Sequence, residues 1–143
     1  MDVRVCGATR IRLAGLAAAI LLARGAGAQS PPQQPAAAAL VGTWRGTSVC
    51  LVRPSACNDE IVVYRIAHTN VADSLTMDAR KIVRGEEQEM GVLSCRFASP
   101  NGQLSCALPK GTWQFRVRND SLVGELRLSD NTKFRDVRAA RAP

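Results

Sequence analysis

Apolar and polar residues alternate with a period of two through most of residues 40–140, and clusters of turn-forming residues interrupt the alternation. A period of two is typical of strands that bury one face, whereas no segment of this region shows the 3.6-residue period of an amphipathic helix. The runs between the turn clusters have the lengths of ordinary strands. The pattern predicts strands at residues 40–52, 60–67, 74–83, 90–98, 103–108, 112–118, 121–128 and 132–140.

The turns between these strands are short, which restricts the topology. Short connections force neighbouring strands to pair antiparallel, so the sheet is a meander. An open meander of eight strands leaves two free edges, and closure into a barrel removes both. The alternative is a two-sheet sandwich, which needs Greek-key crossovers, and the sequence has no connection long enough for one. We therefore expect an all-β, eight-stranded antiparallel up-and-down barrel over residues 40–140.

The N-terminal 28 residues have the pattern of a secretory signal peptide. Three arginines (Arg4, Arg10 and Arg12) precede an apolar run at residues 13–23, and small residues follow at 26–28. The run is shorter than the ~20 apolar residues that a membrane span needs. We expect cleavage after Ala28 and a secreted or periplasmic protein without a membrane span. Residues 29–39, rich in Pro, Gln and Ala, are expected to be a disordered linker, and residues 141–143 a tail.

The formal net charge gives little evidence about function. The formal net charge is +7, and removal of residues 1–28 lowers it to about +4, because that segment holds four arginines and one aspartate. Nucleic-acid binding favours clustered arginines interleaved with aromatic residues. Here the arginines are scattered and the chain has one tyrosine, so no nucleic-acid partner is expected.

Four cysteines remain after cleavage, namely Cys50, Cys57, Cys95 and Cys106. An even number in an exported chain indicates two disulfides, for which three connectivities exist. A zinc site would need Cys-x-x-Cys spacings or histidine partners. The spacings do not fit and His68 is the single histidine, so no metal is expected.

Candidate catalytic residues are few. His68 lies in a polar, turn-like context, and the glutamates at 86, 87 and 89 suit a solvated hairpin tip better than a calcium loop. Asp59 and Glu60 are adjacent on a strand and therefore point to opposite faces. Ser48 and Ser94 have no base nearby in the sequence. The chain is thus predicted to be non-enzymatic and to use no cofactor.

One motif resembles a known family. The first strand contains Gly42-Thr43-Trp44 and precedes a meander of roughly 100 residues in an exported chain, which resembles the lipocalin/calycin superfamily. The resemblance implies that Trp44 closes one end of the barrel, and that an arginine of the last strand, Arg135 or Arg138, lies across its ring. The chain lacks the family's long lid loop and its helix after the barrel.

The cysteines fit this layout. Cys50 and Cys57 would join the end of the first strand across the turn at Pro54. A type I turn at residues 99–102, with Gly102 at a positive φ, places Cys95 opposite Cys106. We therefore expect disulfides Cys50–Cys57 and Cys95–Cys106.

Two functions from different classes suit such a barrel. The first is the binding of a small apolar ligand inside the barrel, against Met77, Trp113, Phe115 and Leu126. The second is a protein-binding module, such as an inhibitor of a secreted protease, because small bacterial metalloprotease inhibitors resemble this layout. A dry interior cavity above roughly 300 Å³ favours the first, and a filled interior with an exposed loop rim favours the second. The sequence specifies neither the ligand or target nor the oligomeric state.

Overall fold

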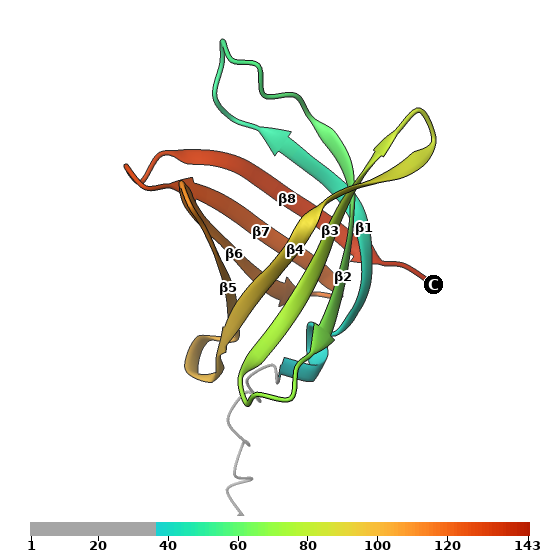
Figure 1. Ribbon diagram of the computed structural model, residues 1–143, viewed down its shortest axis with the longest axis vertical. Coiled ribbons are helices and arrows are strands. Elements are labelled where there is room, and N and C mark those ends of the chain that lie inside the picture. Colours follow the sequence, from blue (N-terminus) through green and yellow to red (C-terminus); the bar gives the residue numbers. More distant parts are fainter. Residues whose placement is uncertain (1–36) are drawn as a thin grey trace, which may run out of the picture. The chain divides into compact units, whose positions relative to one another are not determined.

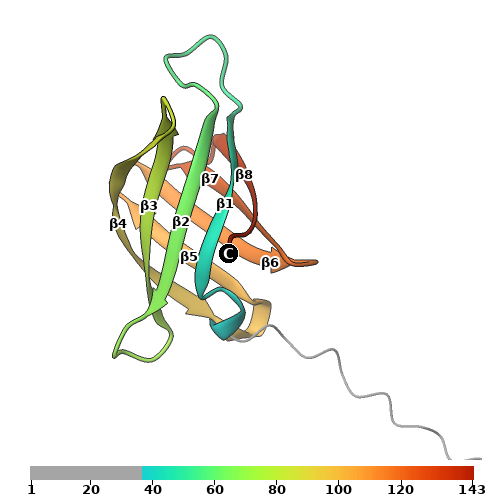
Figure 2. The ribbon, with the colours of Figure 1, turned by 90° about the vertical axis from the view of Figure 1, so that its right-hand side faces the viewer.

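The strands follow one another around a closed barrel (Figures 1 and 2). The structure, a computed structural model, describes residues 37–143, so the predicted signal peptide and most of the predicted linker lie outside the described residues. Each strand pairs antiparallel with the next, and β8 pairs with β1, which confirms the predicted eight-stranded up-and-down barrel. The strands are β1 (Gly42–Cys50), β2 (Glu60–His68), β3 (Ser74–Val83), β4 (Glu86–Ala98), β5 (Gln103–Leu108), β6 (Gly111–Arg118), β7 (Ser121–Leu128) and β8 (Lys133–Arg141).

The largest departure from the predicted strand boundaries is at β4, which begins at Glu86 and not at residue 90. Arg84 and Gly85 both have positive φ, 54° and 88°, so they form a two-residue hairpin turn by themselves. The glutamates that follow are therefore strand residues, and Glu87 pairs with Arg65 of β2 across a 2.9 Å ion pair. These glutamates are exposed beside the hairpin turn, as expected, but they belong to the strand and not to the loop.

The barrel domain is slightly longer than predicted at both ends. Ala37–Ala39 form a short 3₁₀ turn (η1) ahead of the buried Leu40, so part of the expected linker is folded. At the other end, Arg141 is the last residue of β8 and not part of a tail. Both extensions come from contacts between the two ends of the described chain. The guanidinium of Arg141 donates hydrogen bonds of 2.8 Å to the carbonyl oxygens of Ala39 and Val41.

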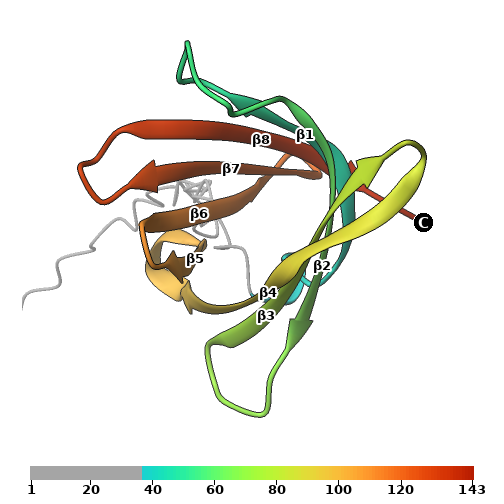
Figure 3. The same ribbon diagram turned by 45° about the horizontal axis from the view of Figure 1, so that its top comes forward.

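Side chains fill most of the barrel interior. Alternate residues of each strand point inward, as the period of two predicts. The large side chains that are less than 2% exposed come from nearly every strand: Leu40, Trp44, Val62, Leu75, Met77, Leu104, Phe115 and Leu122. Figure 3 shows the strands that enclose them.

Trp44 lies in the closed end of the barrel, which we define by Leu40, Trp44 and Arg141. Its ring is fully buried, and its indole Nε1 donates a 2.8 Å hydrogen bond to the Leu40 carbonyl oxygen. The guanidinium carbon of Arg141 lies 4.3 Å from the ring centroid. This geometry is a cation–π contact.

The arginine over Trp44 is therefore Arg141, and the expectation of Arg135 or Arg138 is wrong. The register of β8 against β1 explains the difference, because Trp44 pairs with Arg141. Arg138 pairs with Thr47 on the outer face, and Arg135 pairs with Cys50 near the other end of β1.

Both predicted disulfides are confirmed. Cys50–Cys57 joins the end of β1 to the loop that follows it, and Cys95–Cys106 links β4 to β5 inside the barrel. Cys95 and Cys106 are direct register partners. The tight turn at Ser99–Asn101 (η2) ends in Gly102 with φ 62°, the left-handed conformation that glycine adopts without strain.

Candidate functional site

The opposite end of the barrel carries a cluster of charged and aromatic side chains. We call this cluster the mouth and define it by Ser48, Glu60, Lys81, Trp113, Leu126 and Arg135. It lies at the end with the β1–β2 loop, which is at the top of Figure 1. The closed end and its Trp44 lie at the start of β1, and the mouth begins near the end of that strand.

Arg135 is the centre of the mouth. Its side chain is only 13% exposed, which is unusual for an arginine. Its Nη1 donates hydrogen bonds to the Ser48 hydroxyl at 3.1 Å and to the Ser48 carbonyl oxygen at 3.4 Å. Its Nη2 donates to the carbonyl oxygen of Asn58 at 3.0 Å. These three bonds, made to β1 and to the β1–β2 loop, hold the guanidinium in one orientation.

Glu60 links Arg135 to a second cation. One carboxylate oxygen of Glu60 lies 3.2 Å from Arg135 Nη1, and the other lies 3.5 Å from Lys81 Nζ. Glu60 opens β2 and Lys81 is on β3, so together with Ser48 on β1 and Arg135 on β8 the cluster spans four neighbouring strands. With two cations and one anion, the cluster carries a formal charge of +1. The positive charge that Glu60 does not neutralise can attract an anionic group.

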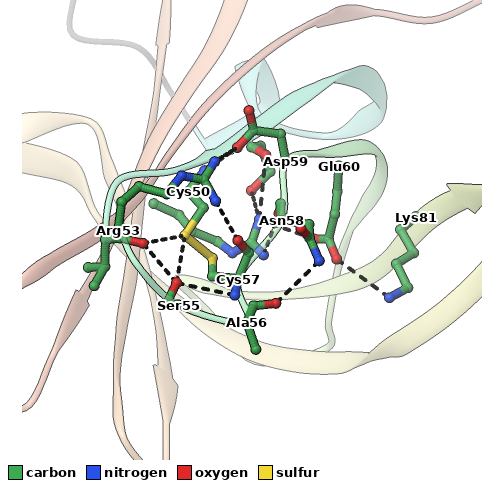
Figure 4. Close-up of polar contacts among 12 residues, drawn as sticks. Cys50, Arg53, Ser55, Ala56, Cys57, Asn58, Asp59, Glu60 and Lys81 are labelled. Atoms are coloured by element: carbon green, nitrogen blue, oxygen red, sulfur yellow. Dashed lines mark hydrogen bonds and ion pairs between the residues drawn. A yellow bond between two sulfur atoms is a disulfide. The ribbon is translucent and has the colours of Figure 1, made fainter.

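The β1–β2 loop positions the Asn58 carbonyl oxygen over Arg135. Figure 4 shows the contacts that fix this loop around the Cys50–Cys57 disulfide. Arg53 donates a 2.6 Å hydrogen bond to the Cys57 carbonyl oxygen and forms a 3.1 Å ion pair with Asp59. The Asp59 carboxylate also accepts a 2.8 Å hydrogen bond from the backbone N–H of Cys50. Asp59 and Glu60 thus serve different partners, as their adjacent positions predicted.

Tyr64 lies deeper in the barrel, next to the charged cluster. Burial raises the pKa of its hydroxyl far above the usual value, the negative charge of Glu60 raises it further, and Arg135 acts in the opposite direction. The hydroxyl is therefore neutral at physiological pH. Its ring packs edge-on against Phe115, with 5.6 Å between the centroids.

An apolar wall faces the same space from β6 and β7. Trp113 and Leu126 are register partners, and Leu126 is in turn the partner of Arg135. Trp113 is partly exposed and stacks on the fully buried Phe115, with 5.2 Å between ring centroids and 21° between ring planes. The mouth therefore joins a partly exposed aromatic surface to a fixed, positively charged cluster.

The structure divides the predicted ligand residues into two groups. It brings Trp113, Phe115 and Leu126 together at one side, while Met77 on β3 is fully buried between Ile66 and Leu93 of its neighbouring strands. Met77 and Phe115, both 0% exposed, fill the interior below the mouth. Cavities of about 650 and 420 Å³ are lined by described residues, and both lie on the outside of the barrel.

The charged residues of the mouth were missed as a site at the sequence level, although a signal for them exists. Glu60 is in phase with the inward-facing Val62, and Lys81 with Ala79. Arg135 is in phase with Val137 and was assigned to the wrong end of the barrel. A charged residue in phase with the buried face of a strand marks an interior polar cluster.

Other site types are not supported in residues 37–143. No group of three or more His, Cys, Asp or Glu side chains in this part of the chain is placed to hold a metal ion. His68 is exposed at the end of β2. Within the same residues, no helix has the length and apolar character to cross a membrane.

Comparisons with known proteins yield a likeness in structure but none in sequence. No protein-family model matches the chain, and no curated protein sequence matches it. Among solved structures, the chain is similar to zebrafish ileal bile acid-binding protein in complex with cholic acid. The identity is 15%, the TM-score is 0.44, and the match covers 73% of this chain and 99% of the zebrafish protein.

Proposed function

We propose that this chain is an exported, non-enzymatic binding protein whose mouth holds a small amphipathic ligand. The apolar body of the ligand packs against Trp113 and Leu126, and its anionic group binds at Arg135. One observation carries this proposal: the largely buried Arg135 belongs to a cluster of net positive charge, together with Glu60 and the more exposed Lys81, beside a partly exposed aromatic side chain in the barrel mouth.

The net positive charge of the mouth is the reason to expect an anionic ligand. Burial of charged groups costs free energy unless each charge is paired and hydrogen-bonded. A purely structural cluster would be expected to balance its charges, yet Glu60 faces both Arg135 and Lys81. A ligand carboxylate would supply the second negative charge, and a guanidinium fork suits a carboxylate. Because side chains fill the interior below the mouth, the apolar body of the ligand lies at the mouth itself.

The test compares head groups on one alkyl chain. We expect decanoate to bind the purified protein more tightly than decanol or decylamine in calorimetric titrations. Arg135→Met should weaken decanoate binding roughly tenfold or more, about 1.4 kcal/mol. Arg96→Met, which removes an exposed charge from the outer face of β4, is the matched control and should leave the affinity unchanged. Equal affinity for the three head groups, or an unaffected Arg135→Met variant, would contradict the proposal.

A second candidate function is supported by the rim of the mouth. Three apolar side chains near the β1–β2 loop are exposed, namely Val49 at 39%, Leu51 at 42% and Ile61 at 48%. Together with the filled interior, they favour a surface that binds another protein, such as a secreted protease. In that case the protein should slow a secreted metalloprotease at stoichiometric concentration, and Leu51→Asp should abolish the effect. A panel of such proteases without any inhibition would remove this candidate.

Export itself has a direct test. The protein recovered from the culture medium or periplasm should begin at Gln29. Recovery of a chain that begins before Leu22 would show that residues 1–28 are not a cleaved signal peptide.

A further inference from the structure

A groove of about 650 Å³ lies on the outer face of the barrel, over β6, β7, β8 and β1, and reaches the rim of the mouth at Val49. Its volume is within the range of ~300–1,000 Å³ that is typical of small-molecule sites. Among the side chains that line it are three arginines, Arg116, Arg118 and Arg138. The groove shares no lining residue with the mouth, and the two sites can be tested separately.

The sheet register brings the arginines together. Val123 of β7 is the partner of Arg116 on one side and of Arg138 on the other. Adjacent strands lie ~4.8 Å apart, so the two arginine Cα atoms flank Val123 at a separation of ~10 Å. Arg118 follows Arg116 by two residues and therefore points to the same face of β6. The three arginines thus share one outer face around Val123.

These three guanidiniums have no acidic partner within residues 37–143, since no carboxylate oxygen of that region forms an ion pair with them. Arg116 Nη2 donates a 2.6 Å hydrogen bond to the side-chain amide oxygen of Gln103 on β5, the strand on the side of β6 away from β7, and this bond leaves the charge of Arg116 unneutralised. Three positive charges on one face, without acidic partners, repel one another. An anion between them would remove this repulsion.

The other part of the groove has a different character. Its carboxylates are already neutralised: Glu125 pairs with Arg127 at 2.7 Å, and Asp136 pairs with Lys133 at 2.6 Å. Thr47 and Gln114 add neutral polar side chains to the lining. This part can exchange hydrogen bonds with hydroxyl groups but does not attract a further charge.

We propose that the groove binds a small phosphate ester of a polyol or sugar. The phosphate lies between Arg116 and Arg138 above Val123, with Arg118 beside it, and the hydroxylated body extends toward Gln114 and Thr47. Guanidiniums bind phosphate oxygens through paired N–H donors, so the ester group is the part that this site recognises most strongly. The polar part of the groove then distinguishes a phosphorylated sugar from inorganic phosphate.

The experiment titrates the purified protein with three probes: glucose 6-phosphate, inorganic phosphate and glucose. We expect glucose 6-phosphate to bind most tightly, inorganic phosphate more weakly, and glucose to show no saturable binding. If neither phosphate compound binds below about 10 mM, the proposal is wrong. If inorganic phosphate binds as tightly as glucose 6-phosphate, the assignment of the hydroxylated body is wrong.

Variants locate the site. The double variant Arg116→Gln/Arg138→Gln should weaken glucose 6-phosphate binding roughly tenfold or more, with an unchanged melting temperature because both side chains lie on the outer face. Arg84→Gln, in the β3–β4 turn, removes one positive charge, as each of the two groove substitutions does, and should leave the affinity unchanged. Arg135→Met should also have no effect. An unaffected double variant, or an equal loss in Arg84→Gln, would overturn the proposal in favour of nonspecific charge attraction.

Discussion

The two ends of the barrel each combine a tryptophan with an arginine of β8, yet the two pairs are built differently. At the closed end, Trp44 is fully buried and Arg141 covers its ring from the exposed side, held by two backbone carbonyl oxygens. At the mouth, Arg135 is the buried partner and Trp113 is partly exposed. At the closed end the Trp44 ring is covered, and the Arg141 guanidinium is used by the ring and the two carbonyl oxygens. At the mouth, part of the Trp113 side chain stays exposed beside the charged cluster. The first arrangement suits stability and the second suits binding.

The space below the mouth reinforces this contrast. Phe115 stacks beneath Trp113 and packs against Tyr64, so the packed core continues from the closed end to the base of the mouth. Mutations at the closed end should therefore change the free energy of unfolding. Mutations at the mouth should change affinity more than stability.

The largest expected effect on stability is at Trp44. Trp44→Ala leaves a large cavity among fully buried neighbours and should lower the free energy of unfolding by ~3–5 kcal/mol. Urea denaturation measures the loss. The Trp44→Ala protein that remains folded should keep its affinity for decanoate, and a stable Trp44→Ala variant without affinity would place this residue in the binding site instead.

The two disulfides lie in different regions of the barrel, so their removal separates effects on stability from effects on binding. Each closes a short loop, so the paired Cys→Ala changes should each cost ~2–3 kcal/mol of unfolding free energy. Loss of Cys50–Cys57 should also weaken ligand binding, because that bridge holds the loop that places the Asn58 carbonyl oxygen on Arg135. Loss of Cys95–Cys106 serves as the control, and equal effects of both changes on affinity would contradict the account.

A smaller effect is expected at Arg141. Arg141→Met removes the cation–π contact with Trp44 and two hydrogen bonds to carbonyl oxygens, which together should cost ~1–2 kcal/mol. The same change at Arg138, on the outer face, should alter the unfolding free energy by less than ~0.5 kcal/mol. Similar losses of unfolding free energy in Arg141→Met and Arg138→Met would show that the contacts of Arg141 do not stabilise the closed end.

The smallest effect near neutral pH concerns Tyr64, the single tyrosine of the chain. Because its pKa is raised in the folded protein, its neutral form stabilises the fold fully below the unfolded-state pKa of ~10, and this contribution is lost as pH rises above that value. Absorbance at the tyrosinate band reports this residue alone. We expect no ionisation in the folded protein at about pH 10.5, and ordinary titration near pH 10 in urea. A midpoint near 10 in the folded protein would show that Tyr64 is solvated.

The sequence contains enough information for the barrel, the strand order and both disulfides, because the period of two and the turn lengths are local properties. The bounds of β3, β5 and β7 follow from the pattern alone. The arginine over Trp44 could not be assigned in the same way. Its identity depends on the register between β1 and β8, the first and last strands of the domain, which are far apart in the sequence.

The mouth was only partly predictable for the same reason. Trp113, Phe115 and Leu126 share inward phase, so their proximity follows from two neighbouring strands and one short turn. The contacts of Arg135 with Glu60 and Ser48 depend on closure of the barrel through β1. The hairpin at Arg84–Gly85 has a local turn signal in its glycine, but the run of glutamates after it has low strand propensity.

Ligand that binds at the mouth and not at the closed end should contact only one of the chain's two tryptophans. Trp44→Phe leaves Trp113 as the only indole, and Trp113→Phe leaves Trp44. We would titrate each variant with an aliphatic carboxylate that carries bromine on its chain, which quenches tryptophan fluorescence on contact. The account predicts saturable quenching of Trp113 and none of Trp44. Quenching of Trp44, or saturable binding without any quenching of Trp113, would contradict it.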